Sequence, residues 1–308
     1  MSQEIHREAS ALDKLTTEAI DPDLMDIDAM DTEARLRVIN TEDAKVALAV
    51  ETQIPQIARA VHRAAHSLRA GGRLIYVGAG TSGRLGVLDA AECPPTFGVS
   101  PTLVQAVIAG GRDAMFESIE GAEDDPEAGA AAMIEGDISP NDTVVGISAS
   151  GRAPFVVGAM RQARKRGAST IAVTNNRNSE LEAVATITIT AVVGPEVLAG
   201  STRMKSGTAQ KMVLNMISTG AMMEIGKTYG NLMVDVQATN TKLKARAARI
   251  VTQVTGCSFA DAETVLANAE GSAKLAIVMI ETGKTADEAR QLIEENGGFL
   301  RKALGGLD

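Results

Sequence analysis

Five short apolar runs, separated by stretches with helical periodicity, constrain the fold of this chain more than any other feature. They are Arg73–Val77, Val104–Ile108, Thr143–Ile147, Ser169–Val173 and Thr186–Thr190. Runs of this length, rich in Val, Ile and Thr and without polar alternation, are typical of strands buried on both faces. Strands that alternate with helices predict an α/β fold, a doubly wound parallel sheet covered on both sides.

Helical patterns flank the predicted sheet on both sides. Residues 21–70 are expected to be mostly helical, and the pattern from Thr208 onward is helical again. Breaks at Gly256 and Gly271 predict a small three-helix tail over residues 250–308. We therefore divide the chain into an N-terminal helical region (1–55), a sheet domain (56–235) and a C-terminal helical domain (236–308).

Composition argues against several classes of function. The net charge of −9 is unlike that of a general nucleic-acid binder, and no polybasic stretch indicates a membrane surface. No apolar run reaches 18 residues, and Met1–Asp13 is polar and lacks a signal-peptide core. We therefore expect a cytoplasmic protein with neither nucleic acid nor membrane as a partner.

A metal site is not indicated by the ligand residues. Cys93 and Cys257 are the only cysteines, too few for a zinc site or a disulfide framework. His62 and His66 stand four residues apart on a predicted helix, which is half a metal site without a third ligand.

The first glycine-rich loop, Gly78–Arg84, follows the first apolar run. Its glycines at positions 78, 80 and 83 have the dinucleotide-binding spacing. An acid should then end the next strand, about 20 residues on, to bind the ribose. That strand instead ends in Ala109–Gly111. The hydroxyls of Thr81 and Ser82 fit a sugar or phosphate ligand better.

A second loop of the same kind, Ser148–Arg152, follows the third apolar run. Backbone N–H groups at a helix start, together with serine hydroxyls, form an anion site. One such loop would be an ordinary strand–helix turn. Two of them at the carboxyl ends of one parallel sheet indicate a small phosphorylated ligand.

A third polar segment precedes the long helix expected from Thr208. It carries Ser201, Arg203 and Lys205, with Lys211 beyond. This segment could hold an anion or could cap the helix, and the two interpretations are compatible.

Two glutamates are candidate acid–base groups. Pro94 is expected to end the helix before it, so Glu92 falls near a helix C-terminus, where the dipole disfavours a carboxylate. Such a position suits a general acid, although on position alone a solvated acid is the simpler interpretation. Glu123 is a second catalytic candidate or an acid at a helix start.

Several long motifs, in order from about residue 25 onward, resemble the N-acetylmuramic acid 6-phosphate etherases. These motifs are Gly78–Gly86, Asp89–Pro95, Glu120–Asp124, Val193–Val197, Ser201–Lys205 and Gly230–Val236.

The resemblance implies a sugar-isomerase (SIS) fold, a small C-terminal tail like a ubiquitin-associated domain, and a homodimer. It also implies cleavage of the C3 ether of N-acetylmuramic acid 6-phosphate into N-acetylglucosamine 6-phosphate and D-lactate, without metal or organic cofactor. Glu92 then matches the acid that assists lactate departure, and Glu123 the second catalytic carboxylate. The phosphorylated amino sugar would be held by Thr81, Ser82, Arg84, Ser148, Ser150, Arg152, Ser201 and Lys205.

One departure from the family pattern stands at Ala153, where the family usually carries Thr. A hydroxyl that could help to hold the phosphate is missing, and Ser201, Thr202 or Lys205 could compensate. Two other functions remain open: a phosphosugar aldose–ketose isomerase, and a phosphosugar sensor without catalysis, like SIS-domain regulators.

Overall fold

A computed structural model describes residues 12, 14–236 and 240–306 of the chain. Met1–Asp13, expected to lack a targeting sequence, lies almost wholly outside the described residues. The chain divides into two compact units, the first reaching to Ala90 and resuming at Thr102–Ser218, and the second formed by Ala91–Pro101 and the residues from Thr219 onward.

The first unit contains one five-stranded parallel sheet of order β2-β1-β3-β4-β5. All five predicted strands are confirmed within a residue at each end. They are β1 (Leu74–Gly78), β2 (Val104–Ile108), β3 (Thr143–Ile147), β4 (Ser169–Thr174) and β5 (Ile187–Thr190). Every residue of β1 and β3 is buried, as an apolar run without alternation requires.

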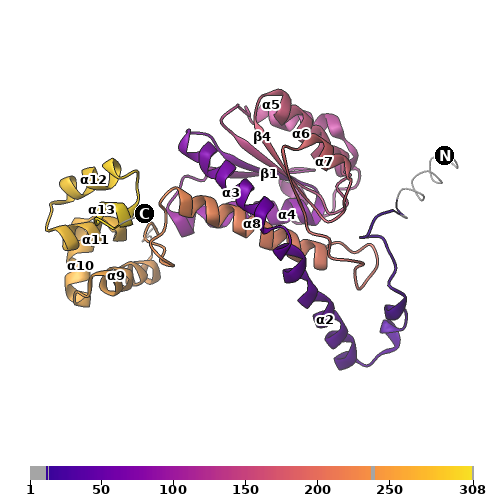
Figure 1. Cartoon of the computed structure of the whole chain (residues 1–308), viewed down its shortest axis with the longest axis horizontal. Coiled ribbons are helices and arrows are strands. Elements are labelled where there is room, and N and C mark those ends of the chain that lie inside the picture. The colour runs from indigo at the N-terminus through magenta and orange to yellow at the C-terminus, as the bar shows by residue number, and fades with distance from the viewer. Residues whose placement is uncertain (1–11, 13, 237–239, 307–308) are drawn as a thin grey trace. The chain divides into compact units, whose positions relative to one another are not determined.

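Helices cover both faces of this sheet, which confirms the doubly wound fold (Figure 1). On one face lie α5 (Pro126–Glu135), α6 (Pro154–Lys165) and α7 (Glu180–Val184), around a core that includes Ile75, Val77 and Val144. On the other lie α3 (Ile54–Arg69), whose Ser67 hydroxyl meets that of Thr143 at 2.8 Å, and α4 (Gly80–Phe97).

Asp89 ties α4 to β1 and to α8 (Lys205–Glu224). Its buried carboxylate accepts hydrogen bonds from the Tyr76 hydroxyl at 2.7 Å, the Asn215 amide at 2.7 Å and the Ser218 hydroxyl at 3.1 Å. A buried carboxylate is stable only with such partners, so these bonds fix how the helices lie against the sheet.

The N-terminal part is helical, as predicted. The short turns η1 (Pro22–Leu24) and η2 (Ile27–Ala29) lead into α2 (Thr32–Glu51). Asp31 caps α2 by accepting from the Ala34 N–H at 2.9 Å. Figure 1 shows α2 extending away from the sheet. Leu36 and Leu48 of this helix are exposed.

Two helix boundaries differ from the predictions. Pro94 does not end α4, which runs from Gly80 to Phe97 and closes at Gly98, a glycine with φ of 63°. Pro94 and Pro95 remove two intrahelical N–H donors, but the helix continues only to Phe97, where Gly98 supplies the left-handed stop. The long helix α8 begins at Lys205 and not at Thr208, so it includes the end of the third polar segment. Between β2 and α5 the chain forms the 3₁₀ turn η3 (Arg112–Met115).

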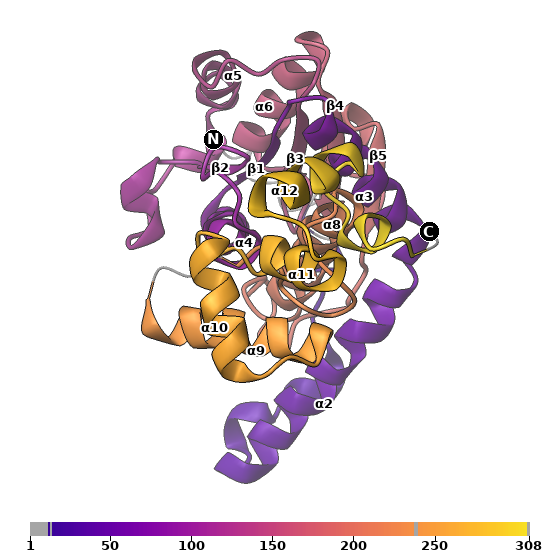
Figure 2. The ribbon, with the colours of Figure 1, turned by 90° about the vertical axis from the view of Figure 1, so that its left-hand side faces the viewer.

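The second unit contains α9 (Thr241–Thr255), α10 (Phe259–Asn268), α11 (Ala273–Thr282), α12 (Ala286–Glu295) and the one-turn α13 (Leu300–Ala303). Consecutive helices from α9 to α12 pack on one another around a shared apolar core (Figure 2). Ser258 caps α10, and Thr285 with Glu288 forms a capping box at the start of α12. The likeness to a ubiquitin-associated domain stays a prediction.

Lys274 holds the loops of this second unit together. Its ammonium donates to the Asp235 carboxylate at 2.5 Å and to the carbonyls of Gly226 and Gly298 at 2.7 and 3.0 Å. Burial lowers the pKa of Lys274, and the contact with Asp235 only partly offsets that effect.

Across the described helices, none is both long and apolar enough to cross a membrane.

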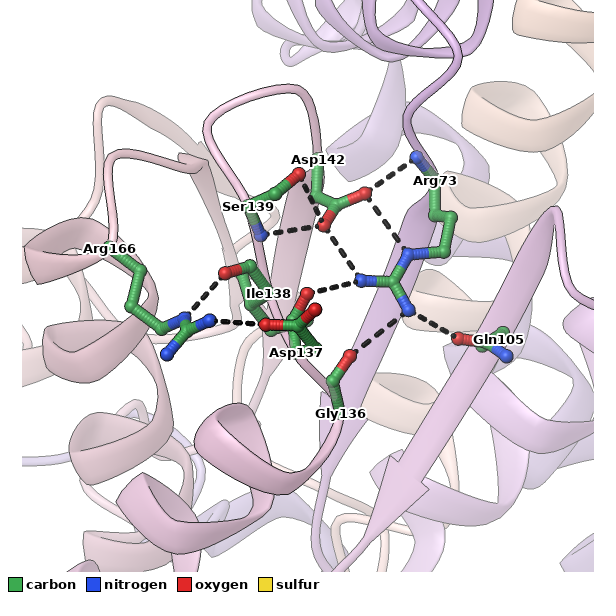
Figure 3. Close-up of polar contacts among 8 residues, drawn as sticks. All are labelled: Arg73, Gln105, Gly136, Asp137, Ile138, Ser139, Asp142 and Arg166. Carbon is green, nitrogen blue, oxygen red and sulfur yellow. Dashed lines mark hydrogen bonds and ion pairs between the residues drawn. The ribbon is translucent and has the colours of Figure 1, made fainter.

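At the amino-terminal edge of the sheet, Arg73 and Asp142 join the starts of β1 and β3 (Figure 3). The Arg73 guanidinium donates to both oxygens of Asp142, at 3.1 and 2.8 Å. Asp142 also accepts from the backbone N–H groups of Arg73 and Ser139, each at 2.8 Å. Burial alone would raise the pKa of Asp142, but these hydrogen bonds outweigh it and lower the pKa.

We predict that Asp142→Asn destabilises the chain by about 3 kcal/mol near neutral pH, because it leaves the Arg73 guanidinium without its bidentate partner. Since the pKa of Asp142 is lower in the folded state, its contribution is present above the unfolded value and is lost as pH falls through the folded one. In urea unfolding, the difference in the free energy of unfolding between Asp142→Asn and wild type should therefore become smaller below about pH 4.

The matched control is Asp137→Asn, which removes the exposed partner of Arg166 in the same cluster (Figure 3). An exposed ion pair contributes less than about 1 kcal/mol, so this control should unfold almost like wild type. Equal destabilisation by both substitutions would contradict the role given to Asp142.

Candidate functional site

A cavity of about 660 Å³ opens at the carboxyl ends of β1 and β3 in the first unit. Its wall is formed by the loops after these two strands, the first turns of α4 and α6, and part of the N-terminal segment. A neighbouring cavity of about 320 Å³ shares Ala79, Gly80, Glu123 and Asp124 with it. The carboxyl edge of a parallel sheet is where ligands of doubly wound folds bind.

Six of the ten predicted site residues line the larger cavity: Thr81, Ser82, Glu123, Ser148, Ser150 and Arg152. Arg84 lines the neighbouring one. Glu92, Ser201 and Lys205 lie outside the lining of both.

The loop after β1 is tighter than the sequence suggested, because α4 begins at Gly80 and takes Thr81 and Ser82 into its first turn. A Cβ at Gly83 would lie 2.6 Å from the Ile108 side chain and 2.8 Å from the Gly78 carbonyl oxygen. Glycine is therefore needed here for the helix to start close against the sheet. Arg84 donates to the carbonyls of Met115 and Glu117, at 3.2 and 3.0 Å, and so supports the loop that carries them.

The loop after β3 is shaped by its own serines. The Ser148 hydroxyl accepts from the Gly151 N–H at 3.1 Å, and the Ser150 hydroxyl accepts from the Arg152 N–H at 3.2 Å. Gly151 has φ of +69°, and a Cβ there would also collide with Ser179. The loop thus holds both hydroxyls at the cavity while leaving their protons available for a ligand.

Two helix N-termini meet this cavity. Its lining includes Gly80–Ser82 from the start of α4 and Pro154 with Val157 from the start of α6. Each helix start carries unpaired N–H groups and the positive end of the helix dipole. The two helix starts therefore suit an anion, and Arg152 and Arg161 add positive charge to the wall. The same wall also carries the acidic residues Glu18, Glu123, Asp124 and Glu180.

Glu123 reaches the cavity through the packing of α5 on α6. Gly129 of α5 lies against the Phe155 carbonyl and Gly158 of α6 against the Pro126 carbonyl, each too close for a Cβ. This contact holds the turn η4 (Ala122–Asp124) at the cavity rim. Glu123 is exposed there and lines both cavities, a position open to a ligand.

Glu92 lies in the second half of α4, in the stretch that groups with the second unit. Its side chain is exposed. Because α4 continues to Phe97, Glu92 is five residues before the helix end. The dipole argument, which applies mainly to the last turn, is correspondingly weaker.

Lys205 is 1% exposed and pairs with Glu42 of α2 at 2.8 Å. Burial would raise the pKa of Glu42, but the hydrogen bonds from Lys205 and Lys45 outweigh it and lower the pKa. The Glu196 carboxylate accepts from the N–H groups of Lys205 and Ser206, both at 2.9 Å, and so caps α8. Of the third polar segment, Thr202 rather than Ser201 lines the cavity.

Sequence reasoning missed several lining residues. Arg161 stands two turns into α6, a spacing from the loop that could have indicated it. Leu12, Leu15 and Glu18 carry no sequence signal. Their segment is held by Asn176, whose amide oxygen accepts from the Thr16 N–H at 2.7 Å and whose amide nitrogen donates to the Thr17 hydroxyl at 2.9 Å.

Within the described ranges, no cluster of three His, Cys, Asp or Glu side chains could hold a metal ion.

Comparison with known families identifies two overlapping SIS-domain matches, to the glucokinase regulatory protein N-terminal SIS domain over residues 56–164 and to the SIS domain over 114–219. The C-terminal lid domain of glucokinase regulatory protein matches residues 230–274. A solved phosphoheptose isomerase from Francisella tularensis, 15% identical, covers 63% of this chain and 100% of its own with a TM-score of 0.50. That likeness shows the fold alone.

Curated relatives match almost the whole chain. An N-acetylmuramic acid 6-phosphate etherase of Brucella anthropi is 54% identical over 96% of both chains, and N-acetylmuramic acid 6-phosphate etherase 2 of Vibrio cholerae is 52% identical over the same shares. The etherase of Clostridium beijerinckii is 51% identical over 98% of this chain and 99% of its own. The chain therefore belongs to the N-acetylmuramic acid 6-phosphate etherase family.

Proposed function

We propose that this chain is a lyase that cleaves the C3 D-lactyl ether of N-acetylmuramic acid 6-phosphate, giving N-acetylglucosamine 6-phosphate and D-lactate. The relatives that carry this name share more than half of their residues with it. The observation in the structure that supports the proposal most is the single cavity in which two helix N-termini, serine hydroxyls and Glu123 meet.

The phosphate group is assigned to the loop after β3. Ser148 and Ser150 can donate their protons to it, the first turn of α6 supplies the positive dipole end, and Arg152 and Arg161 supply charge. Ala153 contributes no hydroxyl. Of the three residues considered as compensation, Thr202 lines the cavity, whereas Ser201 and Lys205 do not.

The reaction is assigned to carboxyl groups acting on the open-chain sugar. Ring opening exposes the C1 aldehyde, which acidifies the proton on C2. Glu123 takes this proton, the released electron pair forms the C2–C3 double bond, and the C3–O bond breaks as an acid protonates the departing lactate oxygen. Water then adds across the double bond and restores a hydroxyl at C3. For the acid, Glu92 stays the candidate that the family resemblance gives.

The two alternatives share the anion site but differ in products. An aldose–ketose isomerase would move a proton between C2 and C1 and release nothing, and a sensor would bind the sugar phosphate without turnover. Release of D-lactate distinguishes the etherase from both. The nearly full-length relatives named as etherases favour lactate release.

The homodimer, the cytoplasmic location and the three-part division at residues 55/56 and 235/236 belong to the same proposal. Leu36 and Leu48 of α2 are exposed apolar side chains that contact with a second copy could bury. Sedimentation equilibrium of the purified chain tests this assembly, and a monomer at about micromolar concentration would contradict it.

Glu123→Gln should lower D-lactate release by at least about 100-fold, because an amide cannot take the C2 proton. Glu127→Gln is the matched control, an exposed glutamate at the start of α5 that lies outside the cavity lining. It should retain wild-type activity. An active Glu123→Gln enzyme would rule out Glu123 as the base.

Glu92→Ala separates the two proton transfers. If Glu92 protonates the leaving oxygen, the variant in deuterated water still exchanges the C2 proton but releases D-lactate at least about 100-fold more slowly. Nuclear magnetic resonance of the sugar and an enzymatic lactate assay measure the two steps on one sample. Loss of C2 exchange together with lactate release would assign Glu92 a different role.

A further inference from the structure

A chain of hydrogen bonds leads from the cavity wall into the protein interior. The Ser82 hydroxyl, in the first turn of α4, donates to the Gln210 side-chain oxygen on α8 at 2.8 Å. The Gln210 amide nitrogen donates to the Asn175 side-chain oxygen at 3.2 Å, directly after β4. The Asn175 amide nitrogen donates to the Ala191 carbonyl at 2.8 Å, directly after β5.

Only one of these hydrogen-bonded side chains faces the cavity. Ser82 belongs to the cavity lining, whereas Gln210 and Asn175 do not and are each 1% exposed. Buried amides need hydrogen-bond partners for their polar atoms, and here protein groups supply them. A donor or acceptor left unpaired at these positions would cost about 1 to 3 kcal/mol.

The donor-to-acceptor direction of these hydrogen bonds is fixed at their inner end. A backbone carbonyl can only accept, so Asn175 must turn its nitrogen to Ala191 and its oxygen to Gln210. Gln210 must then turn its nitrogen to Asn175 and its oxygen to Ser82. Reversing either amide would place two acceptors against each other in the interior. The one proton of the Ser82 hydroxyl is therefore committed to Gln210.

The serines of the second loop have the opposite polarity. Ser148 and Ser150 each use a lone pair to accept from a backbone N–H, and the contact between their hydroxyls is long, at 3.5 Å. Their protons are available to the cavity. Three hydroxyls in one cavity thus present two different chemistries: Ser148 and Ser150 as donors, and Ser82 as an acceptor.

We propose that Ser82 determines specificity for the sugar by accepting a hydrogen bond from a hydroxyl or acetamido N–H, and that Gln210 is the positioning residue that imposes this polarity. The inference rests on the proposed phosphosugar function and deepens it. A phosphate dianion carries no proton to donate, so it is recognised by Ser148 and Ser150 and not by Ser82. The two loops therefore contact opposite ends of the ligand: the loop after β1 contacts the sugar, and the loop after β3 contacts the phosphate.

The test measures binding rather than turnover, so it holds even if the chain releases no lactate. Titration calorimetry gives the dissociation constant of N-acetylglucosamine 6-phosphate for wild type, Ser82→Ala, Gln210→Met and the double variant. Competition gives the affinity for inorganic phosphate. Ser82→Ala should weaken the sugar phosphate about 10-fold, the value of one hydrogen bond, and leave phosphate unchanged.

Gln210→Met should produce the same ligand-selective loss, because it removes the acceptor that directs the Ser82 proton. The double variant should bind no more weakly than Ser82→Ala alone, since both changes remove one interaction. Gln56→Met is the matched control, on α3 and outside the cavity lining, and should bind both ligands as wild type does.

Three results would overturn the proposal. Loss of phosphate affinity in Ser82→Ala would place Ser82 at the phosphate. Additive losses in the double variant would give Gln210 a role separate from Ser82. If inorganic phosphate does not displace N-acetylglucosamine 6-phosphate from the wild type, the cavity has no separate phosphate subsite. If Gln210→Met does not fold, Ser82→Ala alone still decides which end of the ligand Ser82 contacts.

Discussion

The site depends on one constraint, the point between the parallel neighbours β1 and β3 at which the chain connections begin to run in opposite directions across the sheet. From β1 the chain crosses through α4 to β2 on one side, and from β3 it crosses through α6 to β4 on the other. The two connections diverge, so the starts of α4 and α6 flank one opening at the carboxyl edge of the sheet. The anion-binding character of the cavity follows from this topology before any charged side chain is considered.

The two edges of the sheet have different tasks. At the amino edge, Arg73 and Asp142 join β1 to β3 through a partly buried ion pair, and neither residue lines the cavity. At the carboxyl edge, polar groups are left with unused donors or acceptors, as at Ser148 and Ser82. Stability can therefore be altered at one edge and ligand recognition at the other with little effect on each other.

The sequence was sufficient for those features that short-range patterns determine. Buried strands follow from runs of β-branched residues, and the two loops follow from glycines and serines at their ends, so five strands and six lining residues were predicted. Long-range partners left no such signal. The burial of Lys205 depends on Glu42, and the polarity of Ser82 on Gln210 and Asn175, all far away in the chain. Pro94 misled because a proline removes an intrahelical hydrogen bond without necessarily ending the helix, and α4 continues to Phe97.

The central claim is that the cavity at the carboxyl edge binds a phosphorylated sugar, with the loop after β3 holding its phosphate. The most direct measurement is calorimetric titration of the wild-type chain with N-acetylglucosamine 6-phosphate and, separately, with N-acetylglucosamine. We expect the phosphorylated sugar to bind at least about 100-fold more tightly, because two charge-assisted hydrogen bonds and the helix dipole act on its phosphate alone. Equal affinity for the two sugars would contradict the assignment of the cavity.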